Sequence, residues 1–202
     1  MLSWKDKLNG DPVPWLLEND ETQPGVRYYA LRDILGRDEN DKEVKAAKAA
    51  IMVSGPVPVI LAAQQPEGYW EKPGPRYSGT MPALIRMAQF GADGDDARVR
   101  AGCEYLLSQF IDSNGGISIN GMPSGFNHCT AGMTGAALTD LGWLDDQRLQ
   151  TAMEWLARII TGEGVADASD RDTSKGYHES SNSAPPFACA HHNADLPCEW
   201  RS

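Results

Sequence analysis

The sequence predicts an all-α fold made of repeated helix hairpins, and two observations lead to this prediction. Runs in which β-branched residues alternate with polar ones are absent, so the pattern that marks strands is missing. Three stretches resemble one another, each with an apolar residue and a glycine, then an acidic turn, then an amphipathic helix; they are residues 34–52, 89–107 and 140–157. Self-similarity at such spacing is typical of stacked pairs of helices.

The second helix of each repeat, which we call the outer helix, carries its apolar residues on one face. Aligned residues recur at i, i+3 and i+7, which is the spacing of one side of an α-helix. Outer helices are therefore predicted at 41–53, 96–109 and 146–160. The aligned positions hold Val44, Val99 and Leu149, then Ala47, Gly102 and Ala152, and then Ile51, Leu106 and Leu156.

An inner helix precedes each outer helix. Pro24 suits the first turn of the first inner helix, because proline lacks the N–H group that has no partner there. The inner helices are predicted near 24–35, 80–90 and 129–141, with a further short helix at about 56–64. The chain is expected to form a single helical-repeat domain, 1–202, with hairpins at 24–53, 80–109 and 129–160, a polar loop at 165–197 and a fourth inner helix beginning at Cys198.

Composition and charge narrow the class of protein. With 202 residues, of which 41% are apolar and 23% charged, the chain has the balance of a globular protein. Its formal net charge of -10 disfavours nucleic acid as a partner, because binding to phosphates relies on clustered Lys and Arg. The sequence lacks the apolar core of a signal peptide and the roughly 18 apolar residues of a membrane span. We therefore expect a soluble, cytoplasmic protein that does not span a membrane.

A second motif accompanies the hairpins. The stretch LAAQQPEGYW (61–70) has a glutamine followed by Gly-x-Trp, and LLSQFIDSNGGISI (106–119) has Gln109 followed by two glycines and an apolar residue. Together with LPCEW near the end, these motifs resemble the Gln-Trp repeats of the squalene-hopene cyclase and protein prenyltransferase superfamily. The resemblance covers about residues 25–200 and is nearest to uncharacterised bacterial squalene-cyclase-like proteins.

The resemblance implies a partial α/α toroid, in which outer helices surround inner ones. A complete ring of that superfamily needs about six hairpins, whereas this chain has three and the first turn of a fourth inner helix. The chain thus looks truncated relative to a full toroid, and its open repeat edge favours a homo-oligomer. Any activity implied by the resemblance is of the terpene cyclase or prenyltransferase kind.

The stretch ADGDDAR contains Asp93, Asp95 and Asp96, which match the Asp-x-Asp-Asp acid motif of terpene cyclases. In those enzymes the motif begins an inner helix, whereas here it lies in the turn before an outer helix. A carboxylate in that turn can accept the unpaired N–H groups of the helix and so cap it. We expect capping, with acid catalysis as the alternative. The corresponding turns of the other hairpins hold Asp38 and Asp41, and Asp145 and Asp146.

Aromatic side chains could line a pocket for a small, apolar, isoprenoid-like ligand. The alternative is ordinary core packing, together with bracing between hairpins. The predicted ligand-binding residues are Trp15, Tyr28, Trp70 and Tyr77, with Tyr29 beside them.

The cysteines differ in their positions. Cys103 lies beside the packed face of an outer helix and is expected to be a buried, unreactive thiol. Cys129 and Cys198 each begin a predicted inner helix, where the helix dipole favours the thiolate. A loop next to two such thiols could complete a metal site, and zinc fits mixed thiolate and imidazole ligands. The predicted ligands are Cys129, Cys189, His191, His192 and Cys198, with His128 nearby; reduced thiols and a redox or nucleophilic pair remain alternatives.

Two hypotheses for function follow. The first is an enzyme or enzyme-derived pocket protein of the toroid type that holds an apolar, isoprenoid-like or other small ligand and has a Cys/His metal site at the mouth of its cavity. The second is a non-catalytic helical-repeat binding module with a structural zinc ion or plain cysteines. The lack of an acid motif on any inner helix favours the second, whereas the clustered Cys and His residues favour the first.

Overall fold

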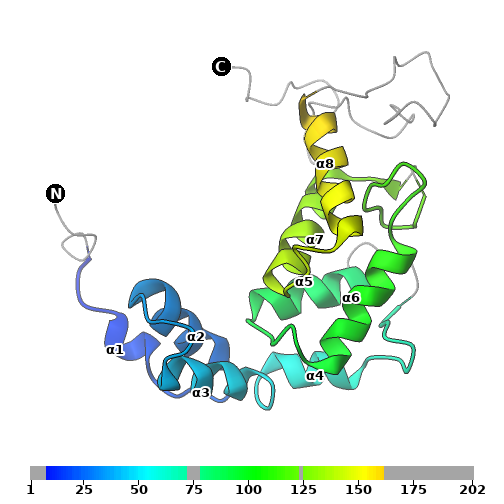
Figure 1. Ribbon diagram of the computed structural model, residues 1–202. Helices are drawn as coiled ribbons and strands as arrows, with labels where there is room; N and C mark the ends of the chain where they lie inside the picture. The colour runs from blue at the N-terminus through cyan, green and yellow to red at the C-terminus, as the bar shows by residue number, and fades with distance from the viewer. Residues whose placement is uncertain (1–7, 72–77, 123–124, 162–202) are drawn as a thin grey trace. The chain divides into compact units, whose positions relative to one another are not determined.

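The computed structural model describes residues 8–71, 78–122 and 125–161, and these residues are predominantly α-helical (Figure 1). Within them, β-structure is limited to two isolated bridges, Ile111 with Ile117 and Ser118 with Phe126. The prediction of an all-α fold is therefore confirmed. The helices are α1 (Val13–Leu16), α2 (Pro24–Tyr29), the π-helical turn η2 (Ala30–Ile34), α3 (Lys42–Ile51), α4 (Pro56–Ala62), α5 (Thr80–Gln89), α6 (Ala97–Gln109), α7 (His128–Asp140) and α8 (Gln147–Thr161).

The helix boundaries agree with the sequence pattern to within two residues at each end. The inner helices are α2 with η2, α5 and α7, and the outer helices are α3, α6 and α8. All the aligned apolar positions of the outer helices are buried, including Val44 and Val99, which are 0% exposed. Two elements were not predicted: α1 is a single turn, and η2 differs from an α-helix only in its hydrogen-bond spacing.

The described residues form two compact units. Of the described residues, the first unit contains those from 8 to 63 together with Gln89–Asp93, and so holds the first hairpin. The second contains those from 64 to 88 and from 94 to 161, and so holds the second and third hairpins.

In the first unit, α2 and α3 pack against each other. Tyr28 is 3% exposed, and its hydroxyl donates to Glu39 at 3.1 Å and accepts from Arg32 at 3.0 Å. The guanidinium of Arg32, which belongs to η2, lies 5.1 Å from the ring centre of Tyr28 and 4.9 Å from that of Tyr29. Tyr28 thus links α2 to Glu39 in the loop before α3 and to Arg32 of η2, and the ammonium of Lys48 on α3 lies 5.9 Å from the centre of its ring.

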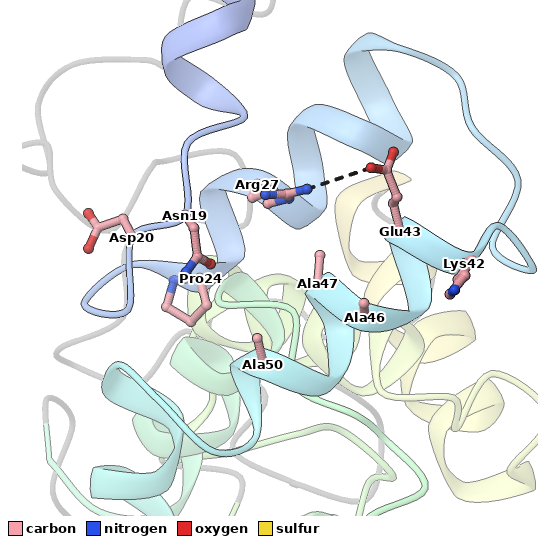
Figure 2. Close-up of a pocket in the computed structure, with 9 residues that line it drawn as sticks. All are labelled: Asn19, Asp20, Pro24, Arg27, Lys42, Glu43, Ala46, Ala47 and Ala50. Atoms are coloured by element: carbon pink, nitrogen blue, oxygen red, sulfur yellow. Dashed lines mark ion pairs between the residues drawn. The ribbon is translucent and has the colours of Figure 1, made fainter.

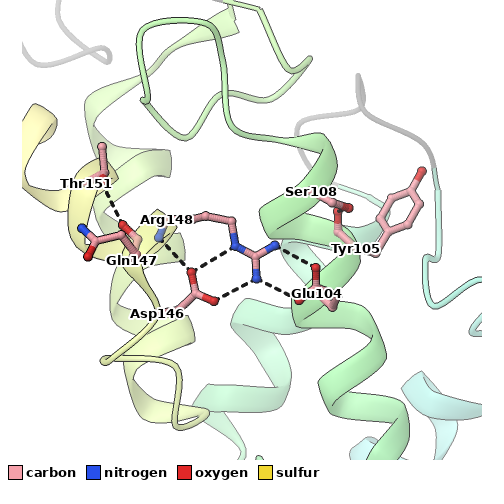
Figure 3. Close-up of polar contacts among 7 residues, drawn as sticks. All are labelled: Glu104, Tyr105, Ser108, Asp146, Gln147, Arg148 and Thr151. Atoms are coloured by element: carbon pink, nitrogen blue, oxygen red, sulfur yellow. Dashed lines mark hydrogen bonds and ion pairs between the residues drawn. The ribbon is translucent and has the colours of Figure 1, made fainter.

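In the second unit, Arg148 joins two successive outer helices (Figure 3). Its guanidinium donates to both carboxylate oxygens of Glu104 on α6, at 2.7 and 2.8 Å. It also donates to Asp146, just before α8, at 2.8 Å. The paired hydrogen bonds fix the orientation of α8 relative to α6 more tightly than a single contact would.

In the described part of the chain, a glycine turn follows each of the first two hairpins and meets the outer helix of the next one. Gly68 has φ +94°, and a Cβ on it would lie 2.7 Å from the carbonyl oxygen of Ala101 on α6. Gly115 has φ +89° and approaches Thr151 on α8, which is the residue that aligns with Ala101. The positive φ favours glycine at both positions, and at Gly68 the close approach also leaves no room for a Cβ.

The two turns also have the same pattern of backbone hydrogen bonds. In the first, the N–H of Gln65 donates to the carbonyl of Tyr69 at 2.7 Å, and that of Gly68 donates to Gln65 at 2.9 Å. In the second, the N–H of Asp112 donates to Gly116 at 2.9 Å, and that of Gly115 donates to Asp112 at 3.0 Å. The repeat predicted from the sequence thus extends to the backbone of the connecting turns.

The aspartates that begin the outer helices act as N-caps. Asp41 accepts from the N–H groups of Glu43 and Val44, and Asp96 and Asp146 each accept at 2.8 Å from the N–H group two residues later. Hydrogen bonds from Arg98 hold the pKa of Asp96 below its usual range. The prediction of capping is confirmed, and the capping residue of the Asp-x-Asp-Asp stretch is its last one.

No single described helix has the length and apolar character needed to cross a membrane. One pair, α3 with α4, meets the test of length and composition together, but the two helices are bent by 42°.

Replacing Asp96 with alanine should lower the free energy of unfolding by about 1 kcal/mol, because the first turn of α6 loses its cap. Asp95 is the matched control, since its side chain is 93% exposed and pairs with Arg100 only at 3.7 Å. Chemical denaturation of Asp96→Ala and Asp95→Ala measures both, and equal losses would contradict the assignment of the cap.

Candidate functional site at the start of α7

The third inner helix, α7, begins with a polar turn that presents a thiol. Asn127 is the N-cap, and its Oδ1 accepts from the N–H of Thr130 at 3.3 Å. The same oxygen accepts from the Sγ–H of Cys129 at 2.8 Å. Cys129 is exposed and lies in the first turn of a 13-residue helix. Its thiol is thus accessible and chemically suited to bind a metal.

His128 lies beside this cysteine but packs inwards. Its ring meets that of Phe126 edge-on with 5.2 Å between centres, and Phe126 meets Trp155 of α8 at 4.4 Å. Burial lowers the pKa of His128, so the imidazole is neutral near pH 7. A neutral imidazole is the form that binds metals, but this ring forms part of an aromatic cluster.

The third hairpin brings the start of α7 close to the end of α8. A Cβ on Gly132 would lie 3.9 Å from Leu156, and Gly135 lies against Met153, so the two helices run antiparallel. Continuing this register places Cys129 level with residue 159, near the last residue of α8, Thr161. The chain therefore leaves the hairpin at the end that carries Cys129.

One side of α7 is apolar and exposed. Met133 is 51% exposed, and Cys129 and Ala136, at helical spacing from it, are exposed as well. The opposite side is buried through residues such as Thr134 and Leu138, each 0% exposed. A helix with apolar residues on all its sides usually lies within a core. Because this apolar side of α7 is exposed instead, it is a candidate binding surface.

Asp112 is a buried carboxyl group in the second glycine turn. The residue is 5% exposed, and its Oδ1 accepts from the N–H groups of Asn114 at 2.8 Å and Gly116 at 3.1 Å. Its Oδ2 is buried and has no hydrogen-bond partner among the described residues. Burial raises the pKa of Asp112, although the backbone N–H groups partly offset this effect. This residue was not singled out from the sequence, where it reads as an ordinary turn aspartate.

The predicted ligand-binding aromatics lie in different environments. Trp15 is 68% exposed in the first unit, and Tyr28 is buried in the same unit. Trp70 belongs to the second unit, where its ring contacts Gly102, whose Cβ would lie 2.9 Å from it. Tyr77 lies outside the described residues. The contacts of Tyr28 and Trp70 are those of core and bracing residues.

Of the predicted metal ligands, only Cys129 belongs to the described part of the chain; Cys189, His191, His192 and Cys198 lie outside it. Across residues 8–71, 78–122 and 125–161, no three potential ligands form a cluster. Cys103 is 0% exposed, and burial raises the pKa of its thiol to about 12. The prediction that Cys103 is a buried thiol is confirmed.

The raised pKa of Asp112 predicts a specific dependence of stability on pH. A carboxyl whose pKa is higher in the folded state destabilises the fold when it is ionised, so this cost should disappear as the pH falls through the folded pKa. Asp112→Asn should therefore be at least as stable as the parent at pH 7, with the difference shrinking towards pH 4. Asp112→Ala should be less stable at both pH values, because the N–H groups of Asn114 and Gly116 lose their acceptor. Thermal unfolding of the three proteins distinguishes these outcomes, and a parent protein that is favoured over Asp112→Asn at pH 7 would contradict the assignment.

Comparisons with family models, with curated proteins and with solved structures find no match for this chain.

Proposed function

We propose that this protein is a non-catalytic helical-repeat binding module of the toroid type. Its ligand is a small apolar molecule that lies along the exposed face of α7, and a zinc ion at the start of that helix fixes the chain beyond α8. The observation that carries the proposal is the exposed apolar side of an inner helix, centred on Met133.

The geometry of the acidic residues supports binding rather than acid catalysis. A terpene cyclase needs a protonated aspartate, whereas Asp96 caps a helix and has a lowered pKa. Asp41 and Asp146 occupy the same position in the other hairpins and also have lowered pKa values. All three carboxylates thus have a structural role that requires the ionised form.

The residues at the start of α7 fit a zinc site in part. Cys129 offers an exposed thiol at a helix N-terminus, which is a suitable first ligand. The segment with Cys189, His191, His192 and Cys198 follows α8, whose end is level with Cys129, and 27 residues separate Thr161 from Cys189. A chain of that length can return to the start of α7, so a site with three thiolates and one imidazole is consistent with the connectivity.

Ligand binding can be tested with an isoprenoid alcohol such as farnesol, followed by calorimetry or intrinsic fluorescence. Met133→Glu should weaken binding at least about tenfold, because a carboxylate on the apolar face must be desolvated by the ligand. Leu144→Glu is the control, since Leu144 is 59% exposed and lies outside α7. Equal affinity of both variants for the ligand would show that the ligand does not bind to α7.

Metal binding can be tested by elemental analysis of protein purified without chelator. About one zinc per chain is expected, and Cys129→Ser should lower it several-fold, because a thiolate ligand is lost. Chelation should then increase cleavage by protease after residue 161 while the helix content remains unchanged. Cys103→Ser serves as the control, since this thiol is buried away from solvent. Well under one metal ion per chain, with the thiol of Cys129 freely titratable, would show that the cysteines are reduced thiols that bind no metal.

A further inference from the structure

The first unit contains an open groove of about 550 Å³ between α3, the start of α2 and the loop before it (Figure 2). Its floor consists of the small residues Ala46, Ala47 and Ala50, and Pro24 lies beside them. The remaining lining residues are charged or polar: Asn19, Asp20, Arg27, Lys42 and Glu43. Arg27 and Glu43 form an ion pair of 3.8 Å across the groove.

The corresponding surface of α6 is covered by the turn that follows the first hairpin. Ala46, Ala47 and Ala50 align with Ala101, Gly102 and Tyr105, respectively. Gly68 approaches Ala101, the ring of Trp70 lies on Gly102, and Tyr69 stacks on Tyr105 with 5.0 Å between ring centres. Each residue on the floor of the α3 groove thus aligns with a residue of α6 that the turn covers.

The residues that hold this turn in place correspond to residues that border the groove in the first unit. The backbone N–H of Trp70 donates to Oγ1 of Thr80 at 3.1 Å, and Thr80 begins α5 as Pro24 begins α2. The side chain of Gln64 donates to the carbonyl of Arg98 at 2.8 Å, and Arg98 aligns with Glu43. The turn therefore lies between the start of the inner helix and the outer helix, where the groove lies in the first unit.

The surface of α8 is covered in the same way by the turn that follows the second hairpin. Gly115 approaches Thr151, which aligns with Ala46. A Cβ on Gly116 would lie 2.5 Å from the ring of Trp155, which aligns with Ala50. Two of the three outer helices thus receive a glycine turn from the hairpin before them, whereas no described hairpin precedes α3.

We propose that the groove on α3 receives the glycine turn that follows the third hairpin, residues 161–165, from a second copy of this chain. The segment reads Thr-Gly-Glu-Gly-Val and aligns with Gln-Pro-Glu-Gly-Tyr (65–69) and Asp-Ser-Asn-Gly-Gly (112–116). Each segment has its glycine in the fourth position, as the positive φ of Gly68 and Gly115 requires. The contact is head-to-tail, because the end of the repeat in one copy meets the beginning of the repeat in the other.

Size and charge agree with this occupant. Gly116 meets a tryptophan on α8, whereas α3 has Ala50 at that position and so has room for the larger Val165. Glu163 is the one charged residue of the segment, and Lys42 is exposed at the rim of the groove. The groove and its occupant are independent of the ligand and the metal proposed above.

The contact can be tested on the full chain by placing the photo-crosslinking residue p-benzoylphenylalanine at position 19, where the exposed Asn19 lines the groove and the three floor alanines are left unchanged. A mixture of isotopically light and heavy chains is irradiated, and the cross-linked peptides are identified by mass spectrometry. Mixed light-heavy products that join position 19 to the peptide containing 161–165 are expected. Products confined to one chain, or products joined to other segments, would overturn the proposal.

Self-association provides a second measurement, made by sedimentation velocity over a range of concentrations. Ala46→Trp fills the groove and Gly164→Val adds a Cβ where the turn meets the helix, so each should weaken association at least about tenfold. Ala49→Trp is the matched control, since Ala49 is exposed on α3 and does not line the groove. Circular dichroism checks that the helix content of all variants is retained. A parent chain that stays monomeric, or equal effects of Ala46→Trp and Ala49→Trp, would refute the contact.

Discussion

The close approach of a glycine turn to the next outer helix is the contact on which the repeat depends. Gly68 and Gly115 bring backbone against the side of α6 and α8, respectively; a Cβ on Gly68 would lie 2.7 Å from the carbonyl oxygen of Ala101, and one on Gly115 would lie 3.4 Å from Thr151. Because the turn is that close, the residues after it reach the outer helix, as Trp70 reaches Gly102. A helix pair buries only part of its apolar surface by itself, so the second and third hairpins rely on the turn that arrives from the hairpin before them.

The helices were predictable because their signals are local. The spacing of Val44, Ala47 and Ile51 and the capping Asp41 lie within one segment, and the same pattern recurs in two further segments. The π-helical turn was not predictable, since no residue in Ala30–Ile34 distinguishes it from an α-helix. The short α1 escaped prediction because one helical turn has no periodicity.

The candidate site was only partly predictable. The position of Cys129 in the first turn of an inner helix followed from the predicted helix boundaries, and the burial of Cys103 followed from its outer-helix register. The inward packing of His128 depends on Phe126, which lies in a loop and packs in turn on Trp155 of α8, and Asp112 is buried within the second glycine turn. Contacts of this kind arise from tertiary packing and leave no trace in local spacing. Cysteine and histidine content indicated a metal, but only the antiparallel α7 and α8 relate Cys129 to the end of the hairpin.

The π-helical turn has a consequence for how the first inner helix can vary in length. A π-helical turn closes its hydrogen bond one residue later than an α-helical turn, as the bond from the N–H of Leu35 to the carbonyl of Ala30 shows. Removing a single residue from this segment would restore α-helical bonding and keep the flanking residues on their faces. Arg32 must be spared, because it bridges Tyr28 and Tyr29. The first hairpin can therefore lose one residue at η2 without changing which residues face its core. The same deletion in the continuous α-helix α7 would rotate Met133 and the residues around it by about 100° relative to the start of the helix.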